Sequence, residues 1–168
     1  MPQPDMAMLG SRPPRRDFLP FSPPSIGPEE IDEVVDTLRS DWITTGPKTR
    51  GFEQAFGAYV GAPGGSSLML NSCTAGLHVA LAALGIGPGD EVIVPALAFA
   101  ASINIVERVG SRPVSADVEP DTLCIDPNSA ADAVTGATRV IMPVHYAAAR
   151  RYQGRCRRRL GEHARVLA

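Results

Sequence analysis

Lysine is almost absent from this 168-residue chain: 15 of its 16 basic residues are arginine, and Lys48 is the single lysine. Any mechanism that needs a lysine side chain must therefore use Lys48. Cysteine is also scarce, and the three residues Cys73, Cys124 and Cys156 are irregularly spaced. This pattern excludes a disulfide framework and a paired zinc site, so we expect no metal and a reducing, cytoplasmic location.

Long hydrophobic runs are missing as well. No apolar run approaches the roughly 18 residues that a membrane-spanning helix needs, so we expect no membrane segment. The prolines and arginines of the first 20 residues are not followed by the apolar stretch of a secretory signal; we interpret residues 1–17 as a flexible leader. Gly87 and Gly89 precede a strand pattern instead of opening a helix, so the dinucleotide-binding fingerprint is absent.

The net charge of −2 conceals two different compositions. Residues 150–168 contain seven arginines and one acidic residue, Glu162, whereas the rest of the chain is acidic. A basic arm for nucleic acid is one interpretation, but the segment has neither interleaved aromatic residues nor a nucleic-acid motif. We favour the interpretation that residues 148–168 are an Arg-rich tail that was read out of frame or is otherwise non-native.

Hydrophobic periodicity predicts two amphipathic helices near the N-terminus. Ile31, Val34, Val35 and Leu38 recur at helical spacing behind Pro28 and two acidic residues, which predicts a helix over 28–40. The same spacing recurs later and predicts a second helix that ends near Gly61; its apolar positions are Phe52, Phe56, Tyr59 and Val60.

Short apolar runs alternate with helical patterns beyond residue 66. The runs predict strands at 67–70, 91–94, 113–116 and 139–142, and the helical patterns lie at 74–84, 99–109 and 128–134. This alternation is typical of an α/β fold with a mostly parallel sheet flanked by helices. We expect the sheet to be incomplete and to end with the run at 139–142.

The segment Asn71–Leu77 runs from a predicted strand through small polar residues into a helix. First-turn N–H groups of a helix lack intrahelical partners, so the Thr74 and Ala75 amides, with the hydroxyls of Ser72 and Thr74, can hold a phosphate. The alternative is that Ser72 is an ordinary N-cap. Cys73 at the same terminus is either a nucleophile or only a small residue in a tight turn, and no spacing pairs it with a histidine.

Phe99 follows the predicted strand 91–94 at the edge where open α/β sheets bind ligands. An aromatic ring there can stack on a flat ligand, or it can belong to the core. His145 and Tyr146 follow the last predicted strand at the same edge and can reach a pocket, although an ordinary structural histidine is the alternative.

Several of these motifs occur in the order found in one family. From about Asp17 to Ala147, the chain resembles the pyridoxal-phosphate (PLP) sugar aminotransferases of the DegT/DnrJ/StrS type. The motifs that carry the resemblance are Trp42–Pro47 with Phe52-Glu53, Asn71–Leu77, Gly89–Pro95, Asp117–Pro127 and Pro143–Tyr146.

The resemblance implies the N-terminal part of a fold-type I large domain over residues 18–147. It implies that Thr74 and Ala75 hold the phosphate of PLP and that Phe99 stacks on the pyridine ring. It places Thr45 and Gly46 near the active site and commonly at a dimer interface. For a complete member it implies a homodimer that acts on a nucleotide-linked keto-sugar with an amino donor, usually glutamate.

Two groups needed for transamination are missing. The reaction needs a lysine that links to the cofactor and moves a proton, and a carboxylate against the pyridinium nitrogen. In the family both follow the motif that matches His145-Tyr146, and Lys48 precedes the first strand of the sheet. We therefore assign no catalytic residue and expect an N-terminal fragment that is inactive alone, poorly stable and prone to associate.

Two alternatives remain open. A sugar 3-dehydratase uses the same cofactor but has a histidine in place of the lysine, so the missing segment would decide between the two activities. A non-catalytic module would instead bind phosphorylated ligands, or would bind a full-length homologue through the helices of residues 28–60.

Overall fold

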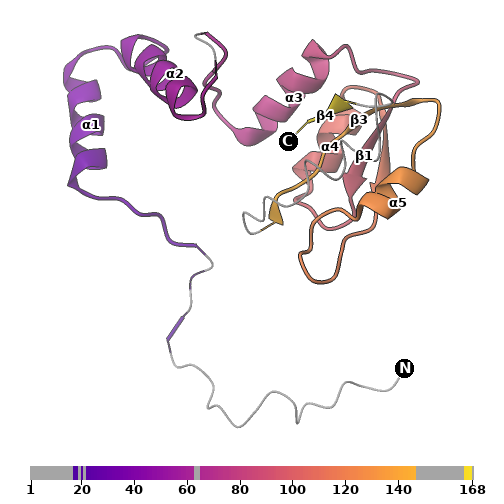
Figure 1. Ribbon diagram of the computed structural model, residues 1–168. Coiled ribbons are helices and arrows are strands. Elements are labelled where there is room, and N and C mark those ends of the chain that lie inside the picture. The colour runs from indigo at the N-terminus through magenta and orange to yellow at the C-terminus, as the bar shows by residue number, and fades with distance from the viewer. Residues whose placement is uncertain (1–16, 19, 21, 63–64, 147–164, 168) are drawn as a thin grey trace. The chain divides into compact units, whose positions relative to one another are not determined.

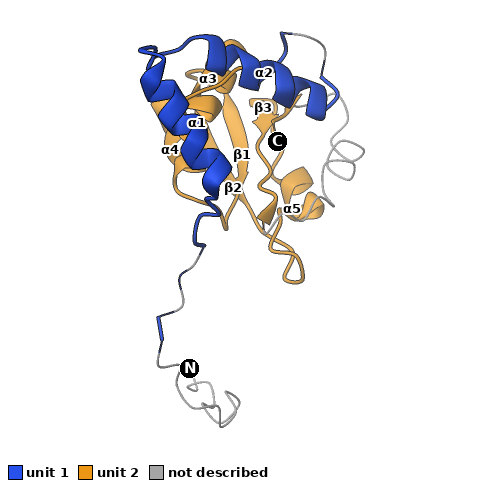
Figure 2. Cartoon of the chain, turned by 90° about the vertical axis from the view of Figure 1, so that its left-hand side faces the viewer, with its two compact units in different colours: residues 1–67 blue, residues 68–168 orange. Residues whose placement is uncertain are grey.

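The computed structural model describes residues 17–18, 20, 22–62, 65–146 and 165–167. The chain forms two compact units, Met1–Ser67 and Leu68–Ala168, each of which is described by itself (Figure 2). Most of the expected leader and most of the expected Arg-rich tail lie outside the described residues. Among the helices that the structure describes, none combines the length and apolar character needed to cross a membrane.

The first unit contains the two helices that the periodicity predicts, α1 (Pro28–Arg39) and α2 (Pro47–Tyr59). Both begin with proline, whose missing N–H costs nothing in the first turn. The Glu30 carboxylate accepts a hydrogen bond from the Gly27 N–H at 2.6 Å and closes the start of α1. No residue of α1 is buried, so its apolar stripe stays exposed.

The second unit is a parallel α/β layer structure (Figure 1). Its elements are α3 (Cys73–Ala83), β1 (Glu91–Pro95), α4 (Ala101–Arg108), β2 (Arg112–Ala116), α5 (Pro127–Asp132), β3 (Thr138–Ile141) and β4 (Arg165–Val166). The strand order is β2-β1-β3-β4, and each neighbouring pair is parallel. The predicted α/β class with a mostly parallel sheet is therefore confirmed.

The central strand β1 is buried on both faces of the sheet. On one face Val92 and Val94 pack with residues of α3 and α4, and on the other Ile93 packs with Ile125 and Ala130. Figure 1 shows α3 and α4 on one side of the sheet and α5 on the other. Each fully buried side chain of this size stabilises the fold by about 1.5–3 kcal/mol relative to an exposed one.

Two expectations about the sheet were wrong. Residues 67–70 form no strand, and Leu68 is 70% exposed; none of the described strands lies beside this run to pair with it. The sheet also does not end with β3, because β4 adds a fourth strand and the Leu167 N–H donates to the Ile141 carbonyl at 2.9 Å. This short strand comes from the segment expected to be non-native.

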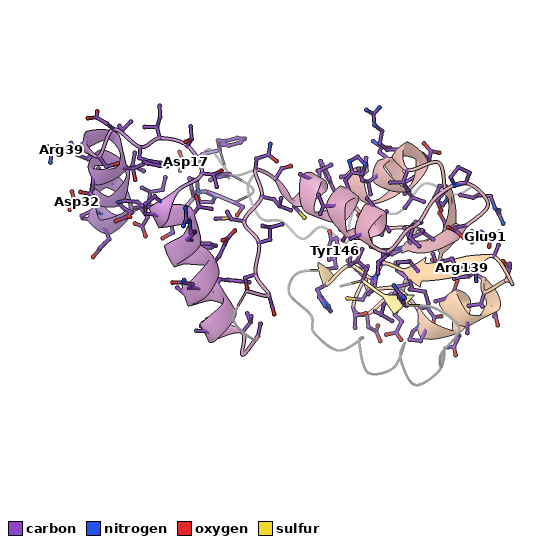
Figure 3. All side chains as sticks on the ribbon, turned by 90° about the horizontal axis from the view of Figure 1, so that it is seen from above. Asp17, Asp32, Arg39, Glu91, Arg139 and Tyr146 are labelled. Atoms are coloured by element: carbon purple, nitrogen blue, oxygen red, sulfur yellow. The ribbon has the colours of Figure 1, made fainter. Side chains whose placement is uncertain are left out.

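A charged network closes the amino ends of the strands. The Glu91 side chain is 8% exposed; its carboxylate pairs with Arg112 and accepts a hydrogen bond from the Thr135 hydroxyl at 2.6 Å. Beside it, Arg139 Nε lies 3.3 Å from an Asp90 carboxylate oxygen. Figure 3 shows Glu91 and Arg139 at one end of the unit and Tyr146 at the other.

Replacing Arg112 by Met should destabilise the fold in a pH-dependent way. The Thr135 hydroxyl first, and then the Arg112 guanidinium, hold the pKa of Glu91 below its ordinary value. A carboxylate with a depressed native pKa contributes stability that is present at neutral pH and is lost as the pH falls through that pKa. The deficit of the Arg112→Met variant in urea unfolding should therefore be present at neutral pH and shrink below about pH 4.

The matched control is Arg108→Met, which removes the same charge at a site without an ion pair among the described residues. Unfolding followed by circular dichroism at several pH values compares the two. A deficit of Arg112→Met that does not change with pH would contradict the role given to Glu91.

Candidate functional site

A hollow of about 480 Å³ lies in the second unit beside the residues that follow β1. It is lined by Thr74 and His78 of α3, by Phe99, and by Asn104 and Arg108 of α4, with Ile105 as an apolar contact. The chain leaves the sheet after Pro95, and Phe99 lies in the turn before α4 with its side chain 82% exposed. The carboxyl edge of the sheet therefore presents an aromatic ring instead of burying it.

Local hydrogen bonding sets the start of α3. The Ser72 hydroxyl accepts a hydrogen bond from the Ala75 N–H at 3.1 Å, and the Gly76 N–H donates to the Ser72 carbonyl at 3.1 Å. Ser72 is thus an N-cap, which was one of the two interpretations of this segment. Within the described structure, the amides of Cys73 and Thr74 have no acceptor and lie at the positive end of the helix dipole.

Thr74 and Phe99 line the same hollow; that they bind a cofactor there stays a prediction. Ala75 is not among the residues that line the hollow, and its amide donates to the Ser72 hydroxyl. His78, Asn104 and Arg108 also line the hollow but were not selected from the sequence as part of one site. The sequence contains a signal that could have indicated them. Thr74 and His78 are four residues apart on α3, and Asn104 and Arg108 are four residues apart on α4, so each pair shares one face of its helix.

The other candidate groups do not assemble into a catalytic set. Cys73 and His78 are exposed, and no hydrogen bond or ion pair connects them among the described residues. His145 follows β3, and its Nδ1 atom is buried without a hydrogen-bond partner. The described residues contain no group of His, Cys, Asp or Glu that could hold a metal ion.

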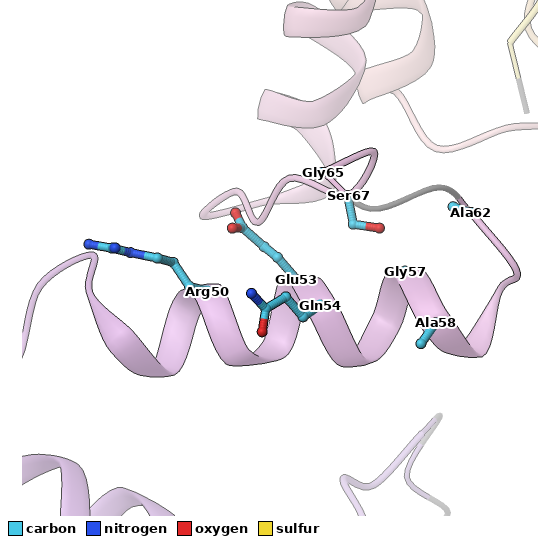
Figure 4. Close-up of a pocket in the computed structure, with 8 residues that line it drawn as sticks. All are labelled: Arg50, Glu53, Gln54, Gly57, Ala58, Ala62, Gly65 and Ser67. Carbon is cyan, nitrogen blue, oxygen red and sulfur yellow. The ribbon is translucent and has the colours of Figure 1, made fainter.

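Thr45 and Gly46 belong to the first unit. The Thr45 carbonyl accepts a hydrogen bond from Trp42 Nε1 at 3.1 Å, and Gly46 is buried. The same unit has a hollow of about 340 Å³ between α2 and the chain that follows it. Figure 4 shows Glu53 and Gln54 on α2 and Ser67 on the facing segment; no residue predicted for the site lines this hollow.

The residues around the hollow beside Phe99 fit a planar cofactor that carries a phosphate. Unbonded first-turn amides and the Thr74 hydroxyl suit a phosphate, and an exposed phenyl ring suits stacking on a flat ring. Arg108 is the only charged side chain that lines the hollow in the described structure. The hollow therefore has groups that can bind such a cofactor, but it has neither a lysine nor a carboxylate to react with it.

Residues 24–150 match the model of the DegT/DnrJ/EryC1/StrS aminotransferase family. The chain belongs to this family. Its members include PLP-dependent sugar aminotransferases with a fold-type I large domain, so the resemblance inferred from the motifs is confirmed.

Three relatives illustrate the match. The chain is 49% identical over 132 residues to SpsC, a spore coat polysaccharide biosynthesis protein of Bacillus subtilis strain 168, covering 79% of this chain and 33% of SpsC. Spr1654 of Streptococcus pneumoniae, proposed to be a sugar aminotransferase and solved in its PMP form, superposes with a TM-score of 0.78 at 45% identity, covering 84% of this chain and 35% of that one. NtdA of Bacillus subtilis, solved with bound PMP, superposes with a TM-score of 0.75 at 31% identity. The match covers 84% of this chain and 33% of NtdA.

The chain spans about a third of the length of these relatives. The family match over residues 24–150 includes the Asn71–Leu77 segment and Phe99.

Replacing Ser72 by Ala should destabilise the protein by about 1 kcal/mol, because the Ala75 N–H loses its capping acceptor. Urea unfolding followed by circular dichroism measures the change. Ser115→Ala is the control, since Ser115 is exposed on β2 and its hydroxyl makes no hydrogen bond in the described structure. Equal unfolding midpoints for the two variants would contradict the capping role.

Proposed function

We propose that residues 18–147 provide the cofactor-binding N-terminal part of a PLP-dependent aminotransferase that acts on nucleotide-linked keto-sugars. The observation that carries this proposal is the common hollow lined by Thr74 and Phe99 beside the carboxyl edge of a parallel sheet. Family membership supplies the reaction class.

In this proposal the chain binds and orients the cofactor. The N–H and hydroxyl of Thr74 hold the phosphate at the positive end of α3, where the amide has no intrahelical partner. The exposed ring of Phe99 stacks on the pyridine ring, and Ile105 shields one side of the hollow from water. PLP, when bound, supplies the electron sink that amino-group transfer requires.

The reacting lysine and the carboxylate for the pyridinium nitrogen are not supplied by these residues. Lys48 is held by two carboxylates of α1, 2.5 Å from Glu33 and 2.7 Å from Asp36. We infer that the chain by itself binds the cofactor without turning over substrate. The residues of the hollow do not distinguish an aminotransferase from a sugar 3-dehydratase, which has a histidine in place of the lysine.

A complete protein is proposed to be a homodimer in the cytoplasm, with a nucleotide sugar and an amino donor as substrates. Thr45 and Gly46 remain proposed contacts for substrate, cofactor or the partner subunit.

A non-catalytic role is a second candidate, favoured by the exposed stripe on α1. Ile31, Val34 and Leu38 are 55%, 60% and 62% exposed. Such a face suits association with a full-length homologue. This role predicts that the chain and SpsC of Bacillus subtilis elute together in size-exclusion chromatography, and that Val34→Asp weakens the complex. Separate elution of the two wild-type proteins would contradict the non-catalytic role.

The primary proposal predicts that the purified chain binds PLP without covalent attachment. Replacing Phe99 by Ala should weaken binding about two- to tenfold, because stacking of aromatic rings contributes about 0.5–1.5 kcal/mol. Thr74→Val, which keeps the side-chain shape and removes the hydroxyl, should also weaken it. Equilibrium dialysis with detection of PLP by absorbance measures these affinities.

The matched control is Phe18→Ala, since Phe18 is 90% exposed and lies in the other unit. Equal losses in Phe99→Ala and Phe18→Ala, or an absence of PLP binding by the wild-type chain, would contradict the proposed site.

A further inference from the structure

The single lysine of the chain connects the two helices of the first unit. Lys48 is the second residue of α2, and its Nζ atom lies 2.5 Å from Glu33 Oε1, 2.7 Å from Asp36 Oδ2 and 3.4 Å from the Glu33 carbonyl oxygen. An ammonium group has three donors, and all three are directed at α1. None is left for a ligand.

The loop between these helices is closed on itself by Trp42. Its indole Nε1 donates to the Thr45 carbonyl at 3.1 Å, and its backbone N–H donates to the Ser40 hydroxyl at 3.2 Å. Gly46 lies so close to the indole that a Cβ atom there would be 2.1 Å from Nε1. Only glycine permits this approach, and the Gly46 carbonyl then accepts the Arg50 N–H of α2 at 3.1 Å.

This arrangement leaves two hydroxyl groups facing outward. Thr44 and Thr45 are exposed, and their hydroxyls have no hydrogen-bond partner in the part of the chain that the structure describes. The Thr45 carbonyl, in contrast, is already used by Trp42.

We infer that Lys48 is a positioning residue: its ion pairs join α2 to α1 and so hold the loop of residues 40–46 in one geometry. The inference rests on the proposed function only for the role of this loop, in which Thr45 and Gly46 are proposed contacts. The positioning itself depends on contacts within the first unit.

Opposite charges stabilise the contact of Lys48 with Asp36 and Glu33 at neutral pH. Hydrogen bonding to Lys48 holds the pKa of Asp36 below its ordinary value, and hydrogen bonding to Asp36 and then to Glu33 holds the pKa of Lys48 above its own. A single exposed ion pair contributes little to stability. Here one cation bridges two carboxylates one turn apart, so the expected effect of losing it is a change in the geometry of the loop.

The test uses Trp42, the only tryptophan of the chain, as a reporter in the full chain without ligand. Lys48→Met should shift the fluorescence emission of Trp42 to longer wavelength and should increase the quenching of this fluorescence by acrylamide, because the indole leaves its contact with Gly46. Lys48→Arg, which can bond to both carboxylates, should restore the wild-type signal. Asp36→Asn should move the signal in the same direction as Lys48→Met.

Asp32→Asn is the matched control, because it makes the same change on α1 at a residue without an ion pair among the described residues (Figure 3). It should leave the emission unchanged. Wild-type emission and quenching in Lys48→Met, with helix content unchanged by circular dichroism, would overturn the inference, as would an Asp32→Asn shift equal to that of Asp36→Asn.

Should Lys48→Met lose helix content, Asp36→Asn decides the matter, because it removes one of the two ion pairs and keeps the lysine. A shift of the tryptophan emission to longer wavelength supports the inference, and wild-type emission overturns it. None of these measurements involves PLP, so the result is independent of the dialysis experiment on Phe99, whose failure would remove the proposed function instead.

Discussion

The complete burial of β1 is the constraint on which the second unit depends. From Glu91 to Pro95 every residue of this strand is buried, and β2 and β3 pair with it on its two sides. The chain must leave the sheet after Pro95, where the Ala96 N–H makes a last bond to the Ala116 carbonyl at 2.8 Å. The position of Phe99 and the start of α4 follow from this exit.

The two ends of β1 differ in their chemistry. At the amino end, hydrogen bonds and ion pairs satisfy the buried carboxylate of Glu91, which stabilises the fold. Near the carboxyl end, Phe99 is exposed and the Thr74 amide has no acceptor in the described structure. Both groups are accessible to solvent, so a ligand can reach them. The two edges of the sheet therefore differ: the amino edge is satisfied internally, and the carboxyl edge is the one proposed to bind the cofactor.

Local sequence patterns were sufficient to predict most helices and strands, whereas the selection of Thr74 and Phe99 as site residues stays a prediction. They failed where partners from elsewhere in the chain decide the structure. Residues 67–70 have a strand pattern, but none of the described strands lies beside them, whereas β4 forms from two residues because the β3 edge is available. The position of Asn104 in the hollow and the ion pairs of Lys48 also depend on contacts between helices, which the local pattern does not show.

Chemical-shift mapping of the ¹⁵N-labelled chain tests the central claim most directly. If the sheet edge binds PLP, its addition should move the amide signals of Thr74 and Phe99, and inorganic phosphate alone should move Thr74 but not Phe99. Shifts confined to residues of the α2 hollow such as Glu53 and Ser67, or no shifts at all, would contradict the account.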